Sequence, residues 1–249
     1  MWTFPVTKDF DKFYALGERT DVAGGAAGDD LWPHANSTMS IPDQTSGVQL
    51  SLVSSSANDV LTTGTGLWTV RVHYLDGNWN PATEDIDLNG LGAVTSVATD
   101  VKFVQRVHAI AAGTLGRSAG AITISEQGGA GVYSEIPANG DMSLACMRMV
   151  PAGKTFRLME WNASSGGNKT IIVKLRANTL GDSSSAEVYG TDNPLFLDKD
   201  TCTLLDSTYV KVFAIPYFIP EKSVIKITAW GPAGGQAPDL SASFEGILV

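Results

Sequence analysis

Hydrophobic and polar residues alternate along most of this chain in short runs. In one such run, Ile171, Val173 and Leu175 alternate with Lys174 and Arg176. A period of two is typical of an antiparallel strand with one face on a core and the other toward solvent or a partner. Clusters of glycine, proline, asparagine and serine separate the runs and mark turns. The predicted strands are residues 67–75, 84–89, 101–111, 121–125, 142–150, 155–161, 170–178, 208–215, 223–230 and 241–248.

This series of short strands indicates an all-β protein, built as an antiparallel β-sandwich or barrel. A chain of 249 residues can bury a sizeable core. We expect the β-sandwich in residues 48–249, either as one unit or as two subdomains that divide near residues 135–140. Residues 1–47 are expected to form an N-terminal arm of a short helix and flexible coil.

The helix is predicted near the start of this arm. Thr7 can cap its first turn and Gly17 can close it. Phe10, Phe13 and Tyr14 fall on one face, at spacings of three and four residues. The glycine- and alanine-rich stretch VAGGAAGDD and further coil follow. Such an aromatic-faced arm either docks on a neighbouring subunit or packs on its own domain, and the stripe alone does not name its partner.

Composition excludes several classes of protein. Hydrophobic residues make up 43% of the chain and charged residues 17%, which argues against disorder. No window approaches the roughly 18 consecutive apolar residues of a membrane helix, so no membrane partner is expected. The first ten residues, MWTFPVTKDF, show no secretory signal. If the protein leaves its host cell, we therefore expect another route, such as lysis within an assembled particle.

The two cysteines, Cys146 and Cys202, are too few for a disulfide scaffold of this size. Cys146 lies between Leu144 and Met147 in a strand-like run, so we expect a buried, inert thiol. A bridge between the two cysteines stays open at this point. Neither has the close Cys or His neighbour that a zinc site would show.

The net charge of −9 arises entirely in residues 1–100, where four Lys or Arg face thirteen Asp or Glu. Residues 148–176, by contrast, hold six cations against one acid, Glu160. An acidic chain repels phosphates, so no nucleic-acid partner is expected. The basic stretch fits an acidic patch on another protein, including a copy of this chain, or is a solvated sheet face. Its candidate partner-binding residues are Arg148, Arg157, Lys174 and Arg176.

Two short motifs match catalytic or nucleotide-binding sequences without the context that this chemistry requires. GRSAG, around Ser118, matches the nucleophile elbow of hydrolases, but a β-branched strand follows it and no histidine comes later in the chain. PAGKTF, around Lys154, lacks the first glycine of a phosphate-binding loop, because Arg148 stands at that position. We therefore expect neither an enzyme nor a bound cofactor.

A predicted hairpin carries the most concentrated polar chemistry of the chain. Asp76, Asn78 and Asn80 occupy positions 1, 3 and 5 of a calcium loop, but Pro81 stands where an EF-hand needs glycine. Asp-Gly and Asn-Pro are ordinary hairpin dipeptides. A structural turn is therefore favoured over a metal site at these three residues.

The return strand of this hairpin carries Asp85 and Asp87, which project from one face about 7 Å apart. That spacing lies within the range of an inverting glycosidase pair. Nothing in the sequence raises the pKa of either carboxyl as an acid catalyst requires, and exposed carboxylates also keep strand edges apart. Trp79, at the hairpin tip, could stack on a sugar ring, fold back over its own sheet or become buried against a second subunit.

Several segments together resemble virion structural proteins of tailed bacteriophages, especially marine and cyanobacterial ones. They are GTG and TVRV with the following LD, TED and LNG in residues 64–90, FVQRVHAIAAGTLGRSAGAITIS, MVPAGKTFRL and the closing DLSASFEGILV. The resemblance in sequence character extends over most of residues 48–249, and the motifs that carry it are structural. The resemblance implies a jelly-roll-like β-sandwich that assembles as trimers on a capsid or tail. It supplies no catalytic residues.

The first hypothesis is therefore a phage head decoration, or cement, protein that binds the lattice of the major capsid protein. It would reside in the virion, after assembly in the host cytoplasm, with the arm of residues 1–47 threading onto neighbours. Its candidate partner-binding residues are Phe10, Phe13, Tyr14 and Trp79, besides the four cations. The alternative is a tail or fibre receptor-binding module that recognises a glycan with Trp79.

Overall fold

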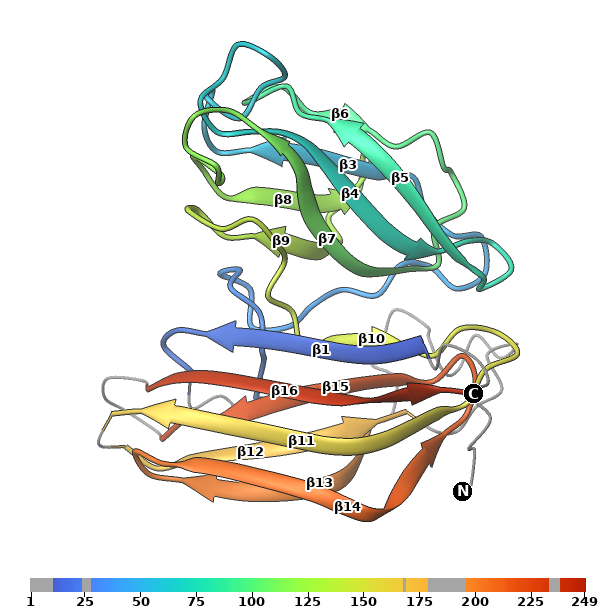
Figure 1. The fold of residues 1–249 in the computed structure, drawn as a ribbon, viewed down its shortest axis with the longest axis vertical. Coiled ribbons are helices and arrows are strands. Elements are labelled where there is room, and N and C mark those ends of the chain that lie inside the picture. The colour runs from blue at the N-terminus through green and yellow to red at the C-terminus, as the bar shows by residue number, and fades with distance from the viewer. Residues whose placement is uncertain (1–10, 24–27, 168, 179–195, 233–237) are drawn as a thin grey trace, which may run out of the picture.

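The computed structural model describes residues 11–23, 28–167, 169–178, 196–232 and 238–249. This part of the chain is all-β, with antiparallel strands in four sheets and no helix. The sheets form two face-to-face pairs, which we call the upper and the lower sheet pair after their positions in Figure 1. The described residues include no helix long and apolar enough to cross a membrane.

The upper sheet pair is built from one continuous stretch of chain. Its strands are β3 (Leu50–Ser54), β4 (Leu67–Leu75), β5 (Pro81–Asp87), β6 (Val94–Thr95), β7 (Phe103–Ala112), β8 (Ile122–Glu126) and β9 (Val132–Ile136). They form the sheets β6-β3-β8-β9 and β5-β4-β7. Alternating apolar residues such as Leu52, Val72 and Ile124 are fully buried between the two sheets, as period-two patterning requires.

The lower sheet pair combines both ends of the described chain. Its strands are β1 (Asp11–Arg19), β2 (Asp29–Asp30), β10 (Met147–Met149), β11 (Phe156–Gly166), β12 (Ile171–Ala177), β13 (Leu197–Leu204), β14 (Thr208–Ile219), β15 (Val224–Trp230) and β16 (Asp239–Leu248). One sheet has the order β1-β16-β11-β14 and the other β10-β15-β12-β13, with β2 beside β15. Phe156, Trp161 and Phe244 fill the core between these sheets.

The upper sheet pair is inserted into the lower one. β1 pairs with β16 along its whole length, from Asp11 opposite Leu248 to Arg19 opposite Leu240. The chain then leaves after β2, builds the upper sheet pair and returns at β10 (Figure 1). The range 135–140, where a division is expected, includes the last two residues of β9 and the start of the segment between β9 and β10.

The short helix predicted near the start of the chain is wrong, because residues 11–19 form strand β1. Ala15, Gly17 and Arg19 are buried while the residues between them are exposed, which is a period of two. Phe13 and Tyr14 therefore point to opposite faces of a strand. Pairing with β16 and packing on the lower core outweigh the local helical spacing of the aromatic residues. Phe10 lies outside the described residues.

A third apolar cluster joins the two sheet pairs. Leu75 and Phe103 come from the upper sheet pair, Met147 and Val224 from the lower one, and Trp32 from the segment that follows β2. All five are at most 2% exposed. Because protein interiors are close-packed, this cluster fixes how the two sheet pairs sit against each other.

Candidate assembly surface and cleft

Strand β14 lies at the edge of the lower sheet pair, farthest from the upper sheet pair (Figure 1), and exposes a run of large apolar side chains. Its sequence is TYVKVFAIPYFI. Val212 is 65% exposed, Ile215 82% and Phe218 54%. Monomeric soluble proteins rarely expose a contiguous apolar patch of more than a few hundred Å². We define the β14 surface as the exposed side chains of Met159, Val210, Val212, Ile215, Tyr217 and Phe218.

The shape of the β14 surface follows from an irregularity in strand pairing. The register between β11 and β14 shifts between Leu158 and Glu160, so residues 213–216 bulge away from β11. Bulges re-aim side chains, and this one places Ile215 on the outside. In the described sheets no strand pairs with the outer edge of β14, and Lys211 is its only charged residue. The bulge, Lys211 and Pro216 are features that soluble proteins use to protect an edge, so the unusual property of this strand is its run of exposed apolar side chains.

Arg157 is the predicted partner-binding cation that lies beside the β14 surface. Its Cζ atom is 5.4 Å from the centre of the Phe218 ring. The Nζ atom of Lys199 lies at the same distance from the ring of Tyr217. Cations over aromatic faces are attracted by the ring electrons and here border an apolar surface with positive charge.

Lys174 and Arg176 lie on β12, in the other lower sheet, and contact residues of their own chain. They pair with the carboxylate of Asp198 at 2.6 and 3.1 Å. Both cations also lie over the ring of Trp230, at 5.0 and 5.6 Å. The structure therefore separates these two residues from Arg157 and from the β14 surface.

Arg148 is buried, with 5% of its surface exposed. Its Nε donates to the carbonyl oxygen of Tyr14 at 3.1 Å, and its Nη1 donates to those of Ala145 and Met147 at 3.1 and 2.8 Å. The side chain thereby ties β1 to β10. It lies inside the molecule, apart from the other three basic candidates.

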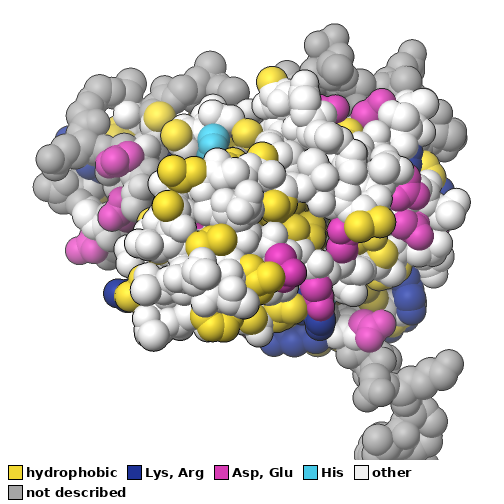
Figure 2. Space-filling view, turned by 90° about the horizontal axis from the view of Figure 1, so that it is seen from above, with side chains coloured by type: hydrophobic (Ala, Val, Ile, Leu, Met, Phe, Trp, Pro, Cys, Tyr) yellow, Lys and Arg dark blue, Asp and Glu magenta, His cyan; other side chains and the backbone are white. Residues whose placement is uncertain are grey.

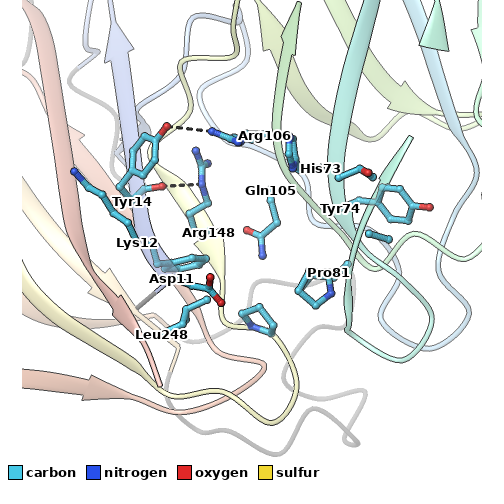
Figure 3. A pocket seen from close by; sticks show the side chains of 15 residues that line it. Asp11, Lys12, Tyr14, His73, Tyr74, Pro81, Gln105, Arg106, Arg148 and Leu248 are labelled. Atoms are coloured by element: carbon cyan, nitrogen blue, oxygen red, sulfur yellow. Dashed lines mark hydrogen bonds between the residues drawn. The ribbon is translucent and has the colours of Figure 1, made fainter. Parts of the chain in front are cut away.

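A cleft of about 480 Å³ opens between the upper and lower sheet pairs (Figure 3). Tyr14 and Arg148 line it from the lower side, and His73, Tyr74 and Arg106 line it from the upper side. Nη1 of Arg106 donates across the cleft to the phenol oxygen of Tyr14 at 3.1 Å. The two guanidinium groups and the phenol meet at the inner end of the cleft.

The inner end of this cleft is electropositive. Burial, followed by the nearby Arg106 guanidinium, lowers the pKa of His73 to about 4. Burial also lowers the pKa of Arg148 to about 10. Within the described part of the chain, neither Arg106 nor Arg148 forms an ion pair.

Sequence reasoning singled out Tyr14 and Arg148 but missed His73 and Arg106. A signal was present: Arg71 and His73 alternate on one strand, and Arg106 alternates with a second histidine on another. Pairing of β4 with β7 puts His73 opposite Arg106. Strand pairing over this distance could not be read from the sequence.

The hairpin tip uses its polar groups within the turn. Oδ1 of Asp76 accepts hydrogen bonds from the backbone N–H groups of Asn78 and Asn80, at 2.8 and 2.9 Å. This is the local side-chain-to-backbone bonding that favours aspartate in turns. Among the described residues, no group of three or more His, Cys, Asp or Glu side chains is placed to hold a metal ion.

Trp79, at the same tip, is packed on its own chain. Its ring lies 4.5 Å from Nζ of Lys222 and 5.3 Å from Nζ of Lys102. Its Nε1 donates to Oε1 of Gln44 at 3.1 Å, and its carbonyl oxygen accepts from the N–H of Ala152. The side chain helps to join the hairpin to the lower sheet pair.

Asp85 and Asp87 each hydrogen-bond to a neighbour on β4. Asp85 forms two hydrogen bonds with Arg71, at 2.6 and 2.8 Å, and Asp87 accepts one from the hydroxyl of Thr69 at 2.7 Å. The hydrogen bond from Arg71 lowers the pKa of Asp85. An acid catalyst needs a raised pKa, so the lowered pKa of Asp85 argues against the glycosidase hypothesis.

The remaining motif residues serve the fold. The hydroxyl of the buried Ser118 donates to the carbonyl oxygen of Pro137 at 2.8 Å, and Lys154 lies in a turn that begins at Pro151. Cys146 and Cys202 are separate, buried thiols. Burial raises their pKa values to about 12 and about 11, which makes both inert.

The end of the molecule opposite β14 has a different surface. Figure 2 shows it from above, with hydrophobic side chains scattered among acidic and uncharged ones. Two of the most exposed apolar residues of the upper sheet pair, Leu91 and Val97, lie in separate loops on either side of β6. Single exposed apolar residues are normal on protein surfaces, so this end lacks a run like that of β14.

Comparison with protein-family models and with curated proteins finds no match. Comparison with solved structures finds a weak resemblance to infectious bursal disease virus. A structure of the Gx strain of that virus has 11% identity, covers 99% of this chain and 74% of its own, and gives a TM-score of 0.26. A crystal structure of the VP2 subviral particle has 10% identity, the same coverages and a TM-score of 0.21. Resemblance of this strength assigns neither a family nor a function.

Proposed function

We propose that this protein is a structural component of a phage virion, a decoration or cement protein that assembles through its β14 surface. The observation that carries the proposal is the exposed apolar run on an edge strand. Its partners would be copies of itself, as a homotrimer, and the major capsid protein. No catalytic role, cofactor or nucleic acid is part of the proposal.

The topology of the lower sheet pair supports this proposal. Its two main sheets contain eight strands, β1 and β10 to β16. When these strands are numbered one to eight in chain order, the sheet orders are 1-8-3-6 and 2-7-4-5. This is the strand order of a jelly roll, an architecture that viral capsid domains use. The resemblance of the sequence to phage virion proteins points the same way.

The size of the β14 surface suits a contact between proteins. With full areas of roughly 150–250 Å² for large side chains, the six exposed fractions amount to on the order of 600 Å². A standard interface buries about 800 Å² on each partner. Burial of the apolar run against another copy would supply most of that area.

Such a protein would stabilise a capsid by mass action. It binds the assembled lattice and not free subunits, so its binding free energy adds to the stability of the shell. The upper sheet pair is held by the inner apolar cluster at the end away from β14, and would project from the bound surface.

A charge placed on the β14 surface tests the proposal. Ile215→Lys and Val212→Lys would each bury a lysine in the contact, so we expect both variants to sediment as monomers where the unchanged protein sediments as a trimer. Val97→Lys is the matched control, since Val97 is 87% exposed but lies on the upper sheet pair; it should remain trimeric. A monomeric unchanged protein that also fails to bind capsids would overturn the proposal.

The receptor-binding alternative needs a free aromatic face at Trp79, and the two lysines over that ring disfavour it. A glycan array with the unchanged protein and Trp79→Ala separates the alternatives. Specific glycan binding that the variant loses would replace assembly as the favoured function.

A further inference from the structure

The cleft between the sheet pairs has an unbalanced positive charge at its inner end. Of the cations that line it, Lys12 has an acidic partner and pairs with Glu245 at 2.9 Å. Among the residues lining the cleft, Asp11 is the only acid. The charges of the inner guanidinium groups are therefore not matched by carboxylates of the described chain.

Arg148 is held in place with hydrogen-bonding capacity to spare. Its Nε and Nη1 donate to three backbone carbonyl groups, which are neutral. Its Nη2 makes no hydrogen bond within the described residues, although the side chain is only 5% exposed. A buried guanidinium normally has an anion as its partner, because removal of the charge from water is costly.

Arg106 faces Arg148 from the opposite wall of the cleft (Figure 3). Within the described chain its hydrogen bond goes to the neutral phenol of Tyr14. The ring of His73, whose Nε2 is buried without a hydrogen-bond partner, lies beside it. Two guanidinium groups that point toward one another repel, and an oxyanion between them would remove that repulsion with charge-assisted hydrogen bonds.

We propose that this cleft is a binding site for a small molecule that carries an oxyanion, held between Arg106 and Arg148 beside the hydroxyl of Tyr14. The cleft volume of about 480 Å³ suits a body of monosaccharide size. Tyr74 and Pro81 line the outer part of the cleft and offer it an apolar wall. The site is formed within one chain, so it stands independently of the assembly proposed above.

Calorimetric titration with matched probes tests the site and identifies the source of the oxyanion. Glucose 6-phosphate carries a phosphate, glucuronate a carboxylate and glucose neither, on bodies of similar size; inorganic phosphate tests the anion alone. We expect binding of at least one anionic probe and none of glucose. Ionic strength is kept constant with chloride, because surface charge attraction is screened by salt. No heat from any of the three anions overturns the proposal.

Arg106→Gln separates a specific site from general attraction. It removes one guanidinium and is expected to weaken binding of the preferred anion about tenfold or more, the usual value of a charged hydrogen bond. Arg157→Gln removes the same charge outside the cleft and should leave the affinity unchanged. Equal loss in both variants, or none in Arg106→Gln, would show that the cleft does not bind the anion.

A second readout does not depend on affinity. Bound anion should raise the pKa of His73, because it cancels part of the field of Arg106 that now lowers it. Titration of the histidine ring signals by NMR, with and without the preferred probe, measures this directly. An unchanged His73 pKa in the presence of a saturating anion would place its binding elsewhere.

Discussion

The three histidines, His34, His73 and His108, are all held in surroundings that oppose their protonation. The rings of His73 and His108 stack at 5.1 Å, and His34 stacks on Trp32 at 4.8 Å. Burial is the main cause of the lowered pKa of each, and nearby arginines add to it. Neutral imidazole is therefore the form that the fold accommodates.

This arrangement predicts loss of stability in mild acid. Each histidine binds its proton more tightly in the unfolded chain, with an ordinary pKa of 6.5, than in the folded one, where that of His73 is about 4. The contribution of His73 to the free energy of unfolding is thus complete above pH 6.5 and is lost as the pH falls toward 4. We expect the thermal midpoint to fall between about pH 7 and about pH 5, and to fall less in His73→Gln. A midpoint that does not change over this range would contradict the prediction.

At the scale of elements, β1 is shaped by how closely it approaches its neighbours. A Cβ atom at Gly17 would lie 2.5 Å from the backbone nitrogen of Cys146 and 2.6 Å from the carbonyl oxygen of Leu31. Both are backbone atoms, which cannot turn aside as the end of a flexible side chain can. Glycine is needed here for space, and the role of closing a helix does not apply.

Gly17→Ala should therefore destabilise the protein by about 1–3 kcal/mol, the usual cost of overpacking. Gly166→Ala is the matched control, because a Cβ there meets no atom within 4 Å. We expect the control to change stability by no more than about 0.5 kcal/mol, as for other surface substitutions. Urea unfolding of both variants measures the difference. Equal effects would indicate that β1 can shift to make room.

Element patterns in the sequence predicted the fold where burial follows a simple period. The expected strand 67–75 coincides with β4, and the strand expected at 223–230 differs from β15 by one residue at its start. The pattern failed at residues 11–19. The aromatic spacing there suggested a helix, but pairing with the distant strand β16 makes this segment a strand. It also failed to flag β14 as a surface: its apolar residues continue through both faces, which normally indicates burial.

The sites were less predictable than the strands, because they depend on which strands meet. Tyr14 and Arg106 are 92 positions apart and touch across the cleft. The sequence around Trp79 suggested an exposed ring at a hairpin tip, because the lysines that cover the ring, Lys102 and Lys222, are distant in sequence. Asp76, by contrast, bonds within its own turn, and its structural role could be read locally.

At the scale of the whole molecule, the apolar cluster between the sheet pairs couples their stabilities. Phe103 of β7 is 2% exposed and packs in that cluster with residues of the lower sheet pair. Phe103→Ala should cost about 3–5 kcal/mol, as for other large core truncations. We further expect calorimetry to show one melting transition for the unchanged protein and two for the variant, one for each sheet pair.

Leu91→Ala is the control for this prediction, because Leu91 belongs to the upper sheet pair but is 64% exposed. It should melt as the unchanged protein does. If Phe103→Ala keeps one sharp transition at a lower temperature, the two sheet pairs are coupled by contacts outside this cluster.

The nesting of one sheet pair in the other also sets an order of events during synthesis. Ala15 on β1 pairs with Phe244 on β16, so β1 lacks this strand partner until β16 has been made. At about 5–20 residues per second, β1 waits for roughly ten seconds or more while the continuous upper sheet pair can already close. A chain that ends early lacks the strand between β1 and β11, and its lower sheet cannot form. Synthesis of β16 thus becomes a condition for the shape that would enter a particle, and copies truncated before β16 could not adopt it.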